Sequence, residues 1–157
     1  MYKIFLLISL IFSSVFAQVD ANLEIIKKAN SLPKILVSVA SNASELETLN
    51  KVKKSLVEDL GVSGHFELAT TNSQARYEDI PDIISLSNQG VSLFLNLSAQ
   101  KESSGDYTLM IKLYDINARA LILEKNFTTS QEERYVFLAH KAVISINTYF
   151  KAPSIDW

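Results

Sequence analysis

Residues 91–127 contain three segments in series that alternate apolar and polar side chains, and this run constrains the fold more than any other part of the sequence. In the first segment every second residue from Val91 to Leu97 is apolar, and a Ser-Ser-Gly-Asp turn follows at 103–106. Alternation with period two is typical of half-buried strands, and short turns of this composition join antiparallel neighbours. The sequence therefore predicts a β-meander, with strands over residues 91–99, 107–115 and 118–127.

The residues before the meander predict two further strands and a helix. Residues 34–40 (KILVSVA) are apolar enough for a central strand. Leucine and valine then recur at helical spacing from Leu46 to Leu60, and Ser44 with Glu47 three residues later predicts a capping box. Glycines at 61 and 64 end this helix, and residues 65–69 (HFELA) predict a short strand.

The remaining segments complete the predicted order. Residues 70–79 are polar and predict a loop, and residues 80–87 predict a short helix with Pro81 in its first turn. A long helix is expected over 131–151, with acidic residues in its first turn. With an alternating segment at 19–25, the order is β-β-α-β-α-β-β-β-α. This predicts an α/β (α+β) fold, a two-layer sandwich whose mixed β-sheet carries two main helices on one face.

Residues 1–17 have the three parts of a signal peptide. Lys3 supplies the positive charge, residues 4–12 are apolar apart from Ser9, and small residues lead to Ala17. A membrane-spanning helix needs about 20 apolar residues, whereas polarity returns at Asp20. We therefore expect export to the periplasm with cleavage after Ala17, and no membrane insertion of the mature chain.

Composition excludes several classes of function. The chain has no cysteine, which excludes disulfides, a zinc–thiolate site, a catalytic thiol and a lipid-bearing cysteine. Its net charge is −2, without a basic cluster, which argues against nucleic acid and anionic membranes as partners.

Catalytic and metal-binding patterns are missing from the sequence. The two histidines, His65 and His140, have no nucleophile or metal-ligand pattern around them, and no phosphate-binding or hydrolase motif occurs. Asp79 and Asp82 are the nearest acidic pair in a loop, and helix capping by one of them is the better interpretation. We expect no catalytic residue, no metal, no cofactor and no small-molecule substrate.

Two segments are candidates for binding another protein. The last predicted helix carries one apolar stripe for the sheet and a second formed by Phe137, His140 and Ile144. Either the neighbouring helix covers this second stripe, or it contacts something outside the domain. The segment 19–25 is either a permanent edge strand or a strand that leaves its sheet and pairs with another protein.

The order and spacing of several motifs carry a family resemblance. They are the Pro33-led strand, the stretch Asp-Leu-Gly-Val-Ser-Gly-His-Phe at 59–66, the meander, and Glu133-Arg134-Tyr135 followed by Ala139-His140-Lys141. Together they resemble the amino-terminal domain of the TolB family, the periplasmic component of the Tol–Pal system, in its epsilonproteobacterial form. The resemblance covers essentially the whole chain. Ile144 and Ser145 depart from it, since an acidic residue is usual shortly after the histidine.

The resemblance implies domains, partners and sites. It implies a TolB amino-terminal domain over 18–152, with 153–157 beginning the connection to a β-propeller that this chain lacks. It also implies a role in outer-membrane integrity and in invagination during cell division, with the inner-membrane protein TolA bound by the amino-terminal strand and the lipoprotein Pal bound by the propeller. Carried onto this sequence, the TolA-binding residues are Val19, Asp20, Ala21, Asn22, Leu23, Glu24 and Ile25. We further hypothesise that Phe137, His140, Ile144 and Trp157 contact the propeller.

Two other functions stay open from the sequence alone. One is another envelope-assembly or secretion accessory factor with a similar α/β domain, although such factors are often lipoproteins and this chain has no cysteine. The other is a small periplasmic hydrolase, for which no nucleophile and base can be recognised.

Overall fold

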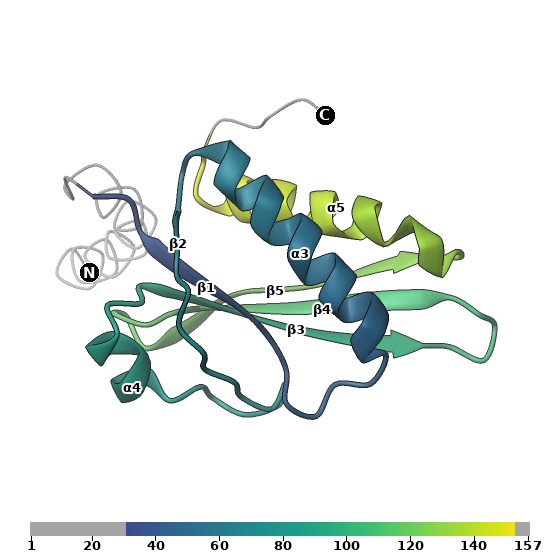
Figure 1. Cartoon of the computed structure of the whole chain (residues 1–157), viewed down its shortest axis with the longest axis horizontal. Coiled ribbons are helices and arrows are strands. Elements are labelled where there is room, and N and C mark those ends of the chain that lie inside the picture. Colours follow the sequence, from purple (N-terminus) through teal and green to yellow (C-terminus); the bar gives the residue numbers. More distant parts are fainter. Residues whose placement is uncertain (1–30, 153–157) are drawn as a thin grey trace, which may run out of the picture. The chain divides into compact units, whose positions relative to one another are not determined.

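The computed structural model describes residues 31–152, so the segment 19–25, the expected signal peptide and Trp157 lie outside the described residues. Figure 1 shows the elements. In chain order they are β1 (Lys34–Val39), α3 (Leu46–Ser63), β2 (Glu67–Leu68), α4 (Ile83–Asn88), β3 (Leu93–Lys101), β4 (Tyr107–Asp115), β5 (Ala120–Thr129), the 3-10 helix η2 (Glu132–Arg134) and α5 (Tyr135–Tyr149).

The five strands form one mixed sheet in the order β2-β1-β3-β4-β5. β1 runs parallel to β2 and to β3, whereas β3, β4 and β5 are antiparallel. The predicted β-meander is therefore confirmed, and the predicted strand at 34–40 lies inside the sheet as its apolar character indicated.

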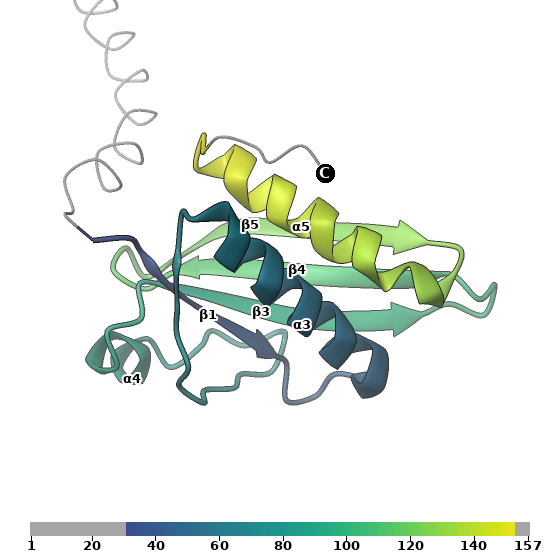
Figure 2. The ribbon, with the colours of Figure 1, turned by 45° about the horizontal axis from the view of Figure 1, so that its top comes forward.

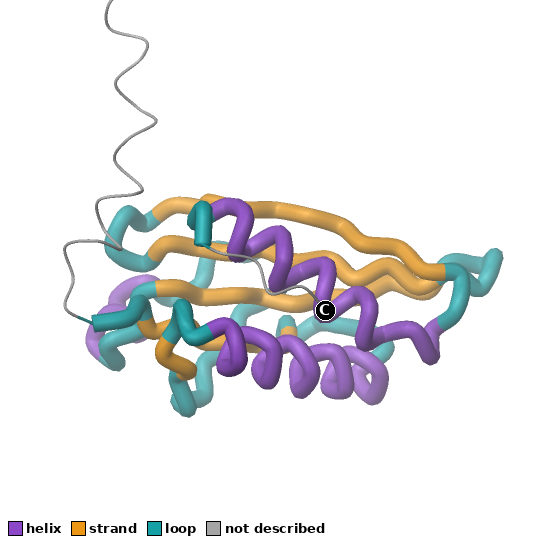
Figure 3. The backbone as a smooth tube through the Cα atoms, turned by 90° about the horizontal axis from the view of Figure 1, so that it is seen from above, coloured by secondary structure: helices purple, strands orange, loops and turns teal. Residues whose placement is uncertain are grey.

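The two long helices lie side by side on one face of the sheet (Figures 2 and 3). Alternate strand residues point toward them, because successive side chains of a strand face opposite sides. Beneath α3 and α5 these residues form a single apolar cluster that includes Ile35, Leu95 and Ile111, all fully buried. The predicted α/β sandwich with two main helices on one face is confirmed.

The opposite face is covered by the segment between β2 and β3. α4 packs Leu86 against Phe94 and Tyr114 in a second, smaller apolar cluster. The preceding residues cross beneath the sheet and bind it through their carbonyl groups. Ser38 Oγ donates to the Ser73 carbonyl (2.8 Å), Asn96 Nδ2 to Arg76 (3.2 Å) and Lys112 Nζ to Tyr77 (3.2 Å). Residues 70–79 have no helix or strand, as predicted, but they form a partial third layer that the prediction did not include.

Two predicted helix starts had different outcomes. The capping box at Ser44 is wrong: α3 begins after Glu45, which has φ 52°, and no side chain caps it. Ser44 Oγ instead donates to the Ala99 carbonyl in β3, at 3.0 Å. The capping role expected of Asp79 or Asp82 is confirmed for Asp82, whose carboxylate accepts from the Ser85 N–H at 3.0 Å. Pro81 precedes this cap rather than lying in the first turn.

Helix length and apolarity bear on membrane insertion. Between residues 31 and 152, no helix is both long and apolar enough to cross a membrane.

Candidate functional site

The described part of the predicted binding surface lies on α5. Phe137 has 61% of its surface exposed and Ile144 has 41%. The two residues are seven positions apart, close to two helical turns, so they occupy the same side of the helix. That side faces away from the buried stripe, which consists of Leu138, Ala139, Ala142, Val143 and Ile146. Phe137 and Ile144 therefore form an apolar surface that no described element covers.

His140 lies between them in sequence but has a different environment. Its Nδ1 is 2.5 Å from Oδ2 of Asp59, which is a buried residue of α3. This contact joins the two long helices. Of the two alternatives for the second stripe, coverage by the neighbouring helix therefore holds for His140, while Phe137 and Ile144 face outward. The spacing of Asp59 with the buried residues Val52 and Leu56 indicates that it lies on the buried side of α3. It does not identify His140 as the partner of Asp59.

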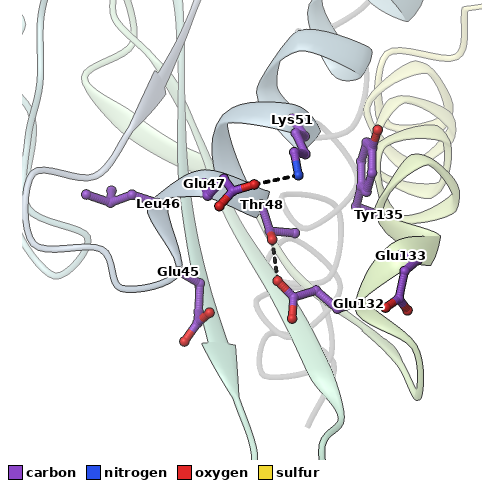
Figure 4. A pocket seen from close by; sticks show the side chains of 8 residues that line it. All are labelled: Glu45, Leu46, Glu47, Thr48, Lys51, Glu132, Glu133 and Tyr135. Carbon is purple, nitrogen blue, oxygen red and sulfur yellow. Dashed lines mark hydrogen bonds and ion pairs between the residues drawn. The ribbon is translucent and has the colours of Figure 1, made fainter.

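A hollow of about 480 Å³ separates the start of α3 from the start of η2 and α5 (Figure 4). Two of its carboxylates, those of Glu132 and Glu47, already have partners within the protein. Glu132 accepts hydrogen bonds from the Lys101 ammonium (2.7 Å) and from the Thr48 hydroxyl, and these bonds hold the pKa of Glu132 below its usual range. Glu47 accepts from Lys51 at 2.8 Å. The contacts of Glu132 thus join the start of η2 and α5 to the start of α3, through Thr48, and to β3, through Lys101.

Tyr77 and Tyr107 are buried tyrosines that are poor candidates for acid–base chemistry. Burial raises the pKa of Tyr77 and of Tyr107, so both hydroxyls stay protonated at neutral pH. Each hydroxyl lies inside the protein without a hydrogen-bond partner among the described residues. Within that same part of the chain, no group of three His, Cys, Asp or Glu is placed to hold a metal ion.

Comparison with known proteins assigns the family. Residues 21–122 match the model of the TolB amino-terminal domain. Among curated proteins, the Tol-Pal system protein TolB of Wolinella succinogenes is 39% identical over 146 residues, covering 92% of this chain and 34% of the relative. That of Helicobacter hepaticus is 36% identical over 155 residues, covering 96% of this chain and 35% of the relative. The chain thus spans about a third of the length of these relatives.

Solved structures share the fold. The crystal structure of TolB from Acinetobacter baumannii aligns with a TM-score of 0.60 and 18% identity, over 76% of this chain and 28% of that one. A PelC dodecamer from Paraburkholderia phytofirmans aligns with a TM-score of 0.51 and 12% identity, over 78% and 90% of the two chains. At such identities the alignments show the fold alone. The sequence match over residues 21–122, on a sheet and helices arranged as in a solved TolB, shows that this chain belongs to the TolB amino-terminal domain family.

Proposed function

We propose that this chain is a periplasmic protein-binding module of the Tol–Pal system, without catalytic activity, that binds TolA through residues 19–25. The observation that carries the proposal is the family match, which begins at Ala21, just beyond the expected cleavage site after Ala17. Residues 21–25 of the segment therefore lie within the matched region. Its alternation of apolar and polar residues suits recognition by strand addition, in which main-chain hydrogen bonds give affinity and alternate side chains give specificity.

The environment of the candidate residues supports a binding function over catalysis. His140 is engaged with Asp59, and the carboxylates of Glu132 and Glu47 are engaged with neighbouring cations. Each of these side chains is held by a partner within the protein, which suits a structural role.

We also propose that Phe137 and Ile144, with His140 and Trp157, contact the rest of a full-length TolB chain. The two exposed side chains support this, because contiguous exposed apolar surface marks sites of protein interaction. In this proposal Pal binds the propeller, and the whole assembly supports outer-membrane integrity and invagination during division.

The TolA proposal is tested by deleting residues 18–24 and measuring binding to the carboxy-terminal domain of TolA by calorimetry. We expect binding to be lost. Leu23→Asp and Ile25→Asp should each weaken it at least tenfold, because each removes an apolar anchor; a tenfold change is about 1.4 kcal/mol.

Two controls separate this outcome from a general defect. Asp20→Ala and Asn22→Ala change side chains on the opposite face of the same segment and should weaken TolA binding less than Leu23→Asp does, because an alanine keeps the main-chain hydrogen bonds of these positions. Phe137→Ser with Ile144→Ser changes the other proposed surface and should also leave it unchanged. TolA binding that survives the deletion would refute the proposal.

A further inference from the structure

The outer edge of β1 is only partly paired. β2 covers its beginning, where Lys34 pairs with Glu67 and Ile35 with Leu68. The Ala69 N–H then donates to the Ile35 carbonyl at 2.9 Å, and the next backbone bond on this side runs from the Ser41 N–H to the Ala75 carbonyl. Within residues 31–152, no backbone hydrogen bond to this edge occurs between those two points.

The alternation of the strand identifies the groups left open. The main-chain N–H and C=O groups of the even-numbered residues of β1 point toward β3. The Ser92 N–H donates to the Lys34 carbonyl, and the Ala40 N–H donates to the Leu97 carbonyl. Val37 and Val39 therefore turn their main-chain groups to the outer edge. Only the Val39 carbonyl has a partner there among the described residues, the Ser38 hydroxyl at 3.3 Å. Buried main-chain groups are nearly always paired in native proteins, so the remaining groups indicate a place for an added strand.

A groove opens beside residues 35–38 of this edge, where the chain leaves the edge after Ala69 and crosses beneath the sheet. It consists of two adjoining hollows of about 360 and 180 Å³ that share Val37, Lys53 and Thr71. Lys53 is half-buried in α3 and makes no ion pair with any described residue, and no acidic side chain lines either hollow. The groove therefore carries one uncompensated positive charge beside open main-chain groups.

We infer that this groove binds the carboxy-terminal end of a partner polypeptide. The partner's last residues add as a short strand beside residues 37–39, and Lys53 holds the terminal carboxylate. A chain end fits better than a continuous strand, because β2 closes the groove at one end and the Ser41–Ala75 bond closes it at the other. The site consists of residues other than 19–25, and the inference does not depend on those residues binding TolA.

The test uses a pentapeptide, Thr-Val-Thr-Val-Val, labelled with fluorescein at its amino end and made with either a free or an amidated carboxyl terminus. Anisotropy titration of the protein should show the free acid binding at least about tenfold more tightly, since one charge-assisted contact is worth roughly that factor. Lys53→Gln should reduce binding of the free acid to the level of the amide. Lys54→Gln, on the exposed side of the same helix, should leave it unchanged.

Three results of this titration would overturn the inference. They are equal affinity for both peptides, an equal loss in both lysine variants, and no binding of the free acid at millimolar concentration. Deleting residues 18–24 should leave peptide binding unchanged even though TolA binding is lost, so the two proposals fail independently.

Hydrogen exchange locates the bound peptide. Saturation with the free-acid peptide should slow exchange of the Val37 and Val39 amides at least tenfold. The Leu36 and Ser38 amides, which face β3, are the internal control and should not change. Protection that appears on β5, the other edge of the sheet, would contradict the assignment.

Discussion

The two faces of the sheet are covered in different ways. Under α3 and α5 the strand side chains are almost all apolar, whereas the opposite face alternates apolar residues with Ser38, Asn96 and Ser98. A helix satisfies its own backbone, so an apolar surface can lie beneath it. The irregular segment at 73–79 brings carbonyl groups that need donors, and side chains from β1, β3 and β4 supply them. The polar residues of this face are thus needed because the segment that covers it has carbonyl groups without partners of their own.

The largest expected effect compares one leucine from each face. Leu95→Ala, beneath the helices, should destabilise the protein by about 4 kcal/mol, because a rigid surround leaves the cavity open. Leu36→Ala, on the other face, should cost about 2.5 kcal/mol, because the irregular segment can relax toward the space. Urea unfolding of both variants measures the difference. Equal losses would show that the two faces are equally rigid.

The second largest effect is expected from the contact between Asp59 of α3 and His140 of α5. Asp59→Ala should cost about 2 to 3 kcal/mol, because it removes the hydrogen bond between the buried Asp59 side chain and His140. A double-mutant cycle with His140→Ala should give a coupling free energy of about 1 to 2 kcal/mol. A coupling near zero would mean that the contact only fills space between α3 and α5.

A smaller effect is expected from the donor that holds the crossing segment. Asn96→Ala removes the hydrogen bond to the Arg76 carbonyl and should cost about 1 to 2 kcal/mol. Amide exchange should accelerate in residues 73–79 while β3 and β4 stay protected. Ser98→Ala, on the same face of β3, is the control and should have little effect. Faster exchange throughout the sheet would contradict a local role for Asn96.

The smallest effect concerns the start of the helical layer. The pKa of Glu132 is lowered in the folded state, so its contribution to stability is present above the ordinary glutamate pKa and is lost as the pH falls below about 4. Glu132→Gln should remove this part of the acid dependence, by less than about 1 kcal/mol as for exposed ion pairs. Thermal unfolding between pH 3 and 7 measures it, with Glu133→Gln as the matched control. An unchanged pH dependence in Glu132→Gln would exclude the contact as a source.

The sequence predicted the helical face well, because its signals are local. Alternation from Val91 to Leu97 and the helical spacing of Leu49, Val52 and Leu56 each follow from a single element packing on one core. The exposed Phe137 and Ile144 were also recognisable, since they lie off the buried stripe of their own helix.

The other face and several contacts could not be predicted, because they join residues far apart in the chain. Asn96 reaches Arg76, His140 reaches Asp59 across 81 positions, and the Ser44 hydroxyl binds Ala99 instead of capping its helix. Local propensity carries no information about such partners. The open edge of β1 depends in the same way on where the chain turns after Ala69.

The position of β1 also determines the order in which the protein can fold. Ile35 of β1 pairs with Leu93 of β3. β1 therefore cannot pair with β3 until α3, α4 and the start of the meander have been synthesised. The contacts of β3, β4 and β5 are short in sequence and close quickly, whereas closing the long loop to β1 is slow. We therefore expect the carboxy-terminal meander with α5 to form the folding nucleus. Mutations in β1 should then mainly speed unfolding, while mutations in β4 should slow folding.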